Sequence, residues 1–144
     1  MPDASEIMNR VTDGFNRHDL EALTRCFDAR GVFVTPSGVG DGLEEITYFF
    51  ESSLTAFPDA VVTLWSTVTC GDTAIGEWTV TGTHGGAYML PGGDVVTATG
   101  RPIAIRGASF CTVDEDGVVG YRIYYDQLEL IAQLGRTVGA EREF

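Results

Sequence analysis

Hydrophobic residues in the first part of the chain recur at the spacing of an amphipathic helix. Between Ala4 and about Arg17 they fall at every fourth position, as Ile7, Val11 and Phe15. Ser5 precedes this stripe and is expected to act as the N-cap. The pattern therefore predicts a first helix over residues 4–17.

Two further helices are expected before residue 57. Asp19 caps a short helix whose apolar residues are Leu20, Leu23 and Phe27. A longer helix is predicted from about Gly42 to Ala56, ending before a proline; its apolar residues are Leu43, Ile46, Phe49, Phe50 and Leu54.

The rest of the chain is rich in β-branched residues separated by turn dipeptides, which is typical of strands. A short strand is expected at residues 32–35, closed by the turn Pro36-Ser37-Gly38. Four longer strands are predicted at residues 61–70, 73–84, 103–113 and 118–128, with an irregular loop at 85–101. Helices followed by an antiparallel meander indicate the α+β class, in which helices cover one face of a bent sheet. The length of 144 residues suits one domain over residues 1–144.

The net charge of the chain restricts the classes of partner that it is expected to bind. The net charge of −12 would repel phosphate backbones and anionic lipid, so we expect neither nucleic-acid nor membrane binding. No apolar run approaches the roughly 20 residues of a membrane span. The N-terminus lacks the basic and apolar stretches of a secretory signal, so we expect a cytoplasmic location.

Cysteine and histidine are too sparse for a convincing metal site. Cys26, Cys70 and Cys111 are far apart, and they are expected to be reduced and mostly buried. His18 and His84 are equally isolated. We therefore expect no metal and no disulfide.

The last strand carries the strongest indication of chemistry. Arg122, Tyr124 and Asp126 alternate along it and would share one face, with Ile123 and Tyr125 on the other. Such a face either meets solvent or lines a cavity, and the apolar sequence on both sides favours a cavity. Desolvation would then raise the pKa of Asp126 and suit it to acid–base catalysis, whereas a nearby arginine would lower it.

Neighbouring strands supply further candidates. Alternation places Trp78 on the more apolar face of its strand, with His84 at the mouth, where it could transfer a proton or only hydrogen-bond a loop. Arg106 stands among small and aromatic residues and could pair with Asp126 or face solvent. Aromatic residues are plentiful enough to surround a flat apolar ligand or to fill a core; those expected at a pocket with Tyr124 and Trp78 are Phe33, Tyr48, Phe49 and Phe110.

These elements and motifs resemble the cone-shaped fold of nuclear transport factor 2 and ketosteroid isomerase, and within it the SnoaL-like polyketide cyclases. Three segments carry the likeness: Phe15-Asn16-Arg17-His18-Asp19, Trp78-Thr79-Val80-Thr81-Gly82-Thr83-His84, and Tyr124-Tyr125-Asp126 followed by Gln133-Leu134-Gly135. The resemblance implies a curved sheet wrapped on N-terminal helices around an internal pocket.

The resemblance also implies an activity. In SnoaL-like cyclases a pocket aspartate closes the last ring of an aromatic polyketide by cofactor-free aldol condensation, in antibiotic biosynthesis. Asp126 matches that aspartate, with His84 and Arg106 assisting. The expected partners are an aromatic polyketide-like substrate and a second copy of the chain, bound through the exposed sheet face.

Two alternatives remain open. Related cofactor-independent hydroxylases use an aspartate and an arginine in a similar pocket, and other members of the superfamily only bind ligands or dimerise. Steroid isomerisation is disfavoured, because Thr35-Pro36-Ser37 and Phe15 stand where an isomerase has its aspartate and tyrosine. Epoxide hydrolysis is disfavoured because Arg106-Gly107-Ala108 lacks the second acid of an Arg-x-Asp pair.

Overall fold

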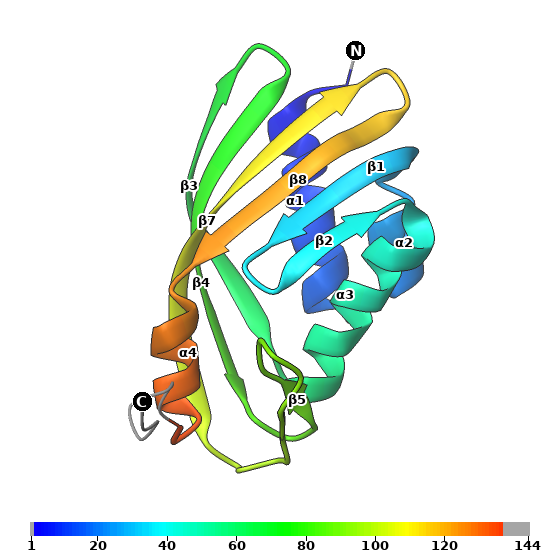
Figure 1. The fold of residues 1–144 in the computed structure, drawn as a ribbon. Helices are drawn as coiled ribbons and strands as arrows, with labels where there is room; N and C mark the ends of the chain where they lie inside the picture. The colour runs from blue at the N-terminus through cyan, green and yellow to red at the C-terminus, as the bar shows by residue number, and fades with distance from the viewer. Residues whose placement is uncertain (1, 137–144) are drawn as a thin grey trace, which may run out of the picture.

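A curved six-stranded sheet forms the body of the protein, and three helices pack against one side of it (Figure 1). The structure, a computed structural model, describes residues 2–136. The strand order is β2-β1-β8-β7-β4-β3, and a separate two-stranded ribbon is formed by β5 and β6. The mixed α+β class and the open, curved sheet confirm the predicted fold. The expected domain, 1–144, includes residues 1 and 137–144, which lie outside the described residues.

The strands of the meander follow the predicted alternation closely. They are β3 (Val61–Cys70), β4 (Thr73–Thr83), β7 (Pro102–Asp114) and β8 (Gly117–Tyr125), each antiparallel to the next. Between β4 and β7 the chain forms the short ribbon of β5 (Tyr88–Met89) and β6 (Val95–Val96), where an irregular loop was expected.

The start of the sheet differs from the prediction. β1 (Phe27–Thr35) is longer than expected and pairs in parallel with β8. It begins at Phe27, which was assigned to the end of the second helix. A register shift between Phe27 and Val32 interrupts its alternation, which hid the strand in the sequence. β2 (Gly38–Asp41) follows as an additional edge strand.

The helices begin at capping side chains. α1 (Ala4–Asn16) is capped by Asp3, which accepts a 2.9 Å hydrogen bond from the backbone N–H of Ser5. The cap is therefore two residues earlier than the predicted Ser5. α2 (Leu20–Thr24) is capped by Asp19, as expected. α3 (Leu43–Ala56) confirms the long third helix.

The end of the chain turns into a helix that the sequence pattern did not predict. α4 (Gln127–Gln133) follows β8 directly and lies at the same end of the molecule as β5 (Figure 1). Within the described residues, no helix has both the length and the apolar character required to cross a bilayer.

Two hydrophobic clusters hold the helices on the sheet. The larger joins α1 and α3 to the sheet, and in it Phe33 stacks on Phe50 with ring centroids 4.4 Å apart. The smaller joins the end of α3 to β7 and α4 through Phe57, Ile105 and Leu130. Aromatic stacking and apolar burial supply most of the favourable energy here. The two clusters leave a cavity between them.

Candidate functional site

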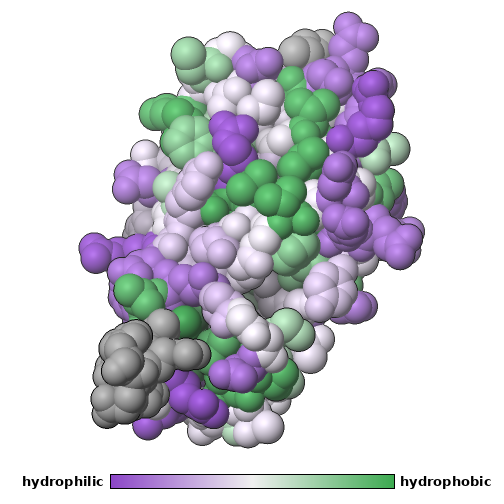
Figure 2. Space-filling model, in the orientation of Figure 1, coloured by the Kyte–Doolittle hydropathy of each residue, from purple (hydrophilic) through white to green (hydrophobic). Residues whose placement is uncertain are grey.

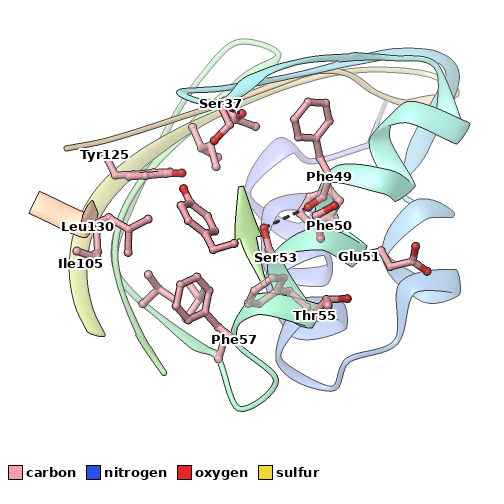
Figure 3. Close-up of a pocket in the computed structure, with 18 of the residues that line it drawn as sticks. Ser37, Phe49, Phe50, Glu51, Ser53, Thr55, Phe57, Ile105, Tyr125 and Leu130 are labelled. Carbon is pink, nitrogen blue, oxygen red and sulfur yellow. Dashed lines mark hydrogen bonds between the residues drawn. The ribbon is translucent and has the colours of Figure 1, made fainter. Parts of the chain in front are cut away.

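A cavity of about 550 Å³ lies between the inner face of the sheet and helices α1 and α3. Figure 3 shows Tyr125 projecting into it from the sheet, opposite Phe49 and Phe50 of α3. Ten aromatic side chains line the cavity: Phe15, Phe33, Tyr48, Phe49, Phe50, Phe57, Trp78, Tyr88, Tyr121 and Tyr125. The volume and the lining suit a flat, ring-containing organic molecule.

Alternation along the strands decides which residues reach the cavity. On β8 the inward residues are Tyr121, Ile123 and Tyr125. On β4 they include Trp78, as its apolar face predicts, and on β7 they include Ser109. The inward faces of β4, β7 and β8 together therefore form one wall of the cavity.

The inner part of this wall contains a buried polar pair. The indole Nε1–H of Trp78 donates a 2.7 Å hydrogen bond to Oγ of Ser109, and both side chains are buried. Tyr121 lies beside this pair, and burial raises the pKa of its phenol, opposed by interactions with the hydroxyls of Ser109 and Thr12. These uncharged groups place hydrogen-bonding atoms at fixed positions in the wall of an otherwise apolar cavity.

A second polar group is formed by Tyr125 at the end of β8 and Tyr88 of β5. Burial raises the pKa of Tyr125, the neighbouring phenol of Tyr88 raises it further, and the hydroxyl of Ser37 opposes the rise. The hydroxyl of Tyr88 is itself buried and makes no hydrogen bond to any described residue. The phenol of Tyr125 therefore keeps its proton near neutral pH and is available as a donor.

Charge is nearly absent from the lining. Among residues 2–136, the one ionisable carboxylate there is Glu51, and no Lys, Arg or His takes part. Glu51 is exposed, and its carboxylate points away from the cavity (Figure 3). A strongly charged ligand would meet no opposite charge inside.

The segment 84–101 covers one end of the cavity and contributes Tyr88, Met89 and Val95 to its lining. Its base is held by the backbone: the N–H groups of Gly85 and Gly86 donate to the carbonyl of Ala56. We call this segment the strap.

Four of the predicted site residues reach the cavity. Trp78, Phe33, Tyr48 and Phe49 all line it. Their aromatic rings supply much of the apolar wall, in agreement with the expectation of an aromatic pocket.

Asp126 has a different setting from the one expected. It lies after β8 rather than within a strand, is exposed, and its Oδ1 accepts hydrogen bonds from the N–H groups of Leu128 (3.0 Å) and Glu129 (3.2 Å). It is the N-cap of α4 and lies outside the cavity lining. Its acid–base role stays a prediction.

Tyr124 was expected in the pocket wall, but the face of β8 that carries Tyr124 and Arg122 is the outer face of the sheet. Tyr124 is 50% exposed and packs edge-on against Phe110 at 6.0 Å, while the guanidinium of Arg122 lies 5.2 Å from the centre of the Phe110 ring. Tyr124 and Phe110 are therefore outside the cavity lining, because the odd-numbered residues of β8 point inward.

Arg106 and His84 are also separated from the cavity. Arg106 is exposed, opposite Thr79 of β4, and within the described chain it forms no ion pair with Asp126. His84 is fully buried, and the backbone N–H of Thr99 donates to its Nδ1 at 3.2 Å. Its Nε2 is buried and has no hydrogen-bond partner among the described residues.

Sequence reasoning did not single out Tyr125, Tyr88 and Ser109. The alternation of Tyr121, Ile123 and Tyr125 was a usable signal, since these residues are as apolar as an inner face requires. Nothing in the sequence marks Tyr88, which reaches the cavity only because the strap folds over it.

The thiols lie away from the cavity, and so does the carboxylate cluster found within residues 2–136. Cys111 is buried, which raises its pKa to about 12, whereas Cys70 is exposed, contrary to the expectation of burial. Carboxylates of Asp28, Asp114 and Asp116 approach within 4.8 Å of one another, but Asp28 already pairs with Arg30.

A protein-family model described as SnoaL-like domain matches residues 8–121. Comparison with curated proteins gives no significant match. Several solved structures share the fold at low identity.

AclR from Streptomyces galilaeus, provisionally described as a hydroxylase, is 21% identical with a TM-score of 0.78 over 92% of this chain and 95% of that one. A protein from Jannaschia sp. CCS1, provisionally described as a SnoaL-like polyketide cyclase, is 17% identical with a TM-score of 0.80 over 91% and 90%. IdmH from Streptomyces antibioticus, provisionally described as a polyketide cyclase, is 24% identical with a TM-score of 0.76 over 94% and 100%.

Proposed function

The chain belongs to the SnoaL-like domain family, and from this premise we propose that it binds a flat, aromatic polyketide-like molecule and closes a ring in it by cofactor-free aldol condensation. The observation that carries the proposal is the cavity of about 550 Å³ with its aromatic, nearly uncharged lining. Such a lining binds fused rings through apolar contact and leaves the hydroxyl groups to orient the oxygen atoms of the substrate.

The proposed reaction needs three events in the cavity. A base removes a proton from a carbon next to a carbonyl, the enolate carbon attacks a second carbonyl to form a carbon–carbon bond, and the new alkoxide takes up a proton. Neutral phenols that donate hydrogen bonds stabilise the enolate and alkoxide more than the starting ketones, which lowers the barrier. Tyr125 and Tyr88 are donors of this kind.

Asp126 remains the proposed acid–base group. It directly follows Tyr125 and precedes Leu130, both of which line the cavity. Its Oδ1 accepts hydrogen bonds from the N–H groups of Leu128 and Glu129, which fix the carboxyl group at the start of α4. His84 and Arg106 take no step in the proposal, because His84 is fully buried with Nδ1 bonded to Thr99, and Arg106 is exposed on the face of β7 that points away from the cavity.

A second candidate is oxygen-dependent hydroxylation of a polyphenol. The aromatic lining of the cavity suits an electron-rich polyphenol, which can itself supply the electrons that oxygen takes up. AclR shares the fold and is provisionally described as a hydroxylase.

One assay separates the candidates. Purified protein is incubated with tricyclic phenolic ketones that carry an activated methylene placed for ring closure, with and without oxygen, and products are identified by mass spectrometry. Cyclisation gives an isomer or its dehydration product in both atmospheres. Oxygenation gives, only in air, a product with one oxygen atom more and two hydrogen atoms fewer, because the polyphenol supplies the electrons and the second oxygen atom leaves as water. Binding without conversion indicates a ligand-binding module and contradicts the proposed catalysis.

The outer face of the sheet is proposed to bind a second copy of the chain. Trp65 is 68% exposed and Tyr124 half exposed on a face where Phe110 adds a further ring. Figure 2 shows a band of hydrophobic side chains between hydrophilic flanks on the face in view. Light scattering tests this: Trp65→Glu should yield monomers, while Leu128→Glu on α4 should not, and a wild-type monomer would contradict it.

A further inference from the structure

The hydroxyl of Tyr88 lacks a partner in a place where a hydroxyl needs one. Its oxygen is sealed from solvent, and no described residue hydrogen-bonds to it, although its ring lines the cavity. Buried polar groups are nearly always hydrogen-bonded in folded proteins, and the exceptions often mark sites completed by another molecule.

Tyr125 presents a second phenol close to the first from the opposite wall. Tyr88 comes from the strap and Tyr125 from the end of β8, and the two are near enough for the phenol of Tyr88 to influence ionisation of Tyr125. Their rings are held separately: Tyr88 packs on Phe57 at 5.9 Å, and Tyr125 packs edge-on against Trp78 at 6.5 Å.

Each of the two phenols brings one O–H donor to the cavity. Burial keeps the pKa of Tyr125 above its usual range, so the group carries its proton. The chemistry that fits two converging O–H donors in an otherwise apolar wall is an uncharged oxygen acceptor with two lone pairs, such as a ketone or quinone carbonyl.

We propose that Tyr88 and Tyr125 together form a two-donor site for one carbonyl oxygen of the ligand, bound between the strap and β8. This inference rests on the proposed ligand class, a flat aromatic ketone. In the proposed condensation this oxygen is the one that becomes the enolate. Entry of the oxygen requires the ring of Tyr88 to move slightly, and the strap that carries it joins the body at Gly85-Gly86 and at Gly100, which has φ +71°.

A matched pair of ligands tests the site. 9-Fluorenone and fluorene have the same three-ring shape, but only fluorenone has a carbonyl. Calorimetry, with protein injected into the dilute ligand, measures the affinity of each for wild type, Tyr88→Phe, Tyr125→Phe and the double variant. Tyr124→Phe is the control, because it removes the same hydroxyl from the outer face.

We expect wild type to prefer fluorenone, and each single variant to lose roughly 3- to 10-fold in fluorenone affinity while fluorene binding is unchanged. Tyr124→Phe should alter neither. The infrared carbonyl stretch of bound fluorenone should move to higher wavenumber in each variant as a hydrogen bond is lost, a readout that a general packing defect would not produce.

Three results would overturn the site. Equal loss of both ligands in the variants, or an unshifted carbonyl stretch, rejects the two-donor role. Binding of both ligands by wild type without preference rejects this site but leaves the proposed class of flat aromatic substrate intact. Binding of neither ligand rejects both proposals.

Discussion

Trp78 donates its indole N–H to the hydroxyl of Ser109 over 2.7 Å, and the pair joins β4 to β7 in the buried wall of the cavity. Because both side chains are buried, the indole N–H and the Ser109 hydroxyl each rely on the other for a hydrogen bond. Removal of one leaves the other polar atom unsatisfied, whereas removal of both costs much less.

The first prediction concerns this pair. Ser109→Ala should lower the free energy of unfolding by about 1–3 kcal/mol, because the indole N–H is left buried without an acceptor. In a Trp78→Phe background the same substitution should cost much less. Urea unfolding of the four proteins measures the coupling, and an equal cost of Ser109→Ala in both backgrounds would show that the hydrogen bond is unimportant.

The second prediction concerns the space that the indole ring of Trp78 occupies beside Gly107. Gly107 lies directly opposite Trp78 in the β4–β7 ladder, and a Cβ there would overlap the indole ring. Gly107→Ala should therefore displace the indole, destabilise the protein by about 1–3 kcal/mol and weaken ligand binding.

Thermal unfolding and fluorenone titration measure these two effects. Gly71→Ala provides a control for a glycine with open space around it, although its φ of +61° adds backbone strain. An unchanged Trp78 emission spectrum in Gly107→Ala, measured with Trp65 replaced by Phe, would refute the predicted displacement.

The third prediction separates two roles of Asp126. Asn is as good an N-cap as Asp, so Asp126→Asn should preserve α4 and global stability, whereas Asp126→Ala should cost about 1 kcal/mol. If Asp126 is the proposed acid–base group, Asp126→Asn nevertheless abolishes turnover. Steady-state rates and urea unfolding test both roles, and an active Asn variant would leave Asp126 with a capping role alone.

The fourth prediction follows from the raised pKa values of Tyr121 and Tyr125. Unfolded tyrosine ionises near pH 10, while these two phenols stay protonated in the folded state, so the unfolded state binds fewer protons above that pH. Stability should be unaffected by them below about pH 10 and should fall above it, by up to about 1.4 kcal/mol per pH unit for each phenol.

Urea unfolding between pH 8 and 11 measures this slope. Tyr125→Phe should reduce the slope by removing one of the two groups, and Tyr124→Phe serves as the exposed-site control. A slope in Tyr125→Phe identical to wild type would show that burial does not suppress ionisation of Tyr125.

Much of the fold could be predicted from local pattern. The helix over Leu43–Ala56 and the four long strands follow from apolar spacing and turn residues, which act over a few positions. β1 was missed in part because the polar residues after Phe27 and a register shift break its alternation. α4 was missed because its cap, Asp126, also continues the alternation of β8.

The candidate site, like the fold, could be predicted from the sequence only in part. Local pattern identified Trp78, Phe33, Tyr48 and Phe49, since large apolar residues on amphipathic elements face a core or a cavity in either case. It assigned the wrong face of β8 to the cavity. It could not place Tyr88, which is 37 residues before Tyr125 in the chain and reaches the cavity only through the fold of the strap.

By itself the sequence therefore determined that β8 has two faces, one with Arg122 and Tyr124 and the other with Ile123 and Tyr125. Only the tertiary structure decided which face is inside, because a strand alternates with a period of two whatever covers it. Packing of α1 and α3 against Tyr121 and its neighbours placed Tyr125 in the cavity and Tyr124 outside. The turn of the chain into α4 then gave Asp126 its place at the start of a helix.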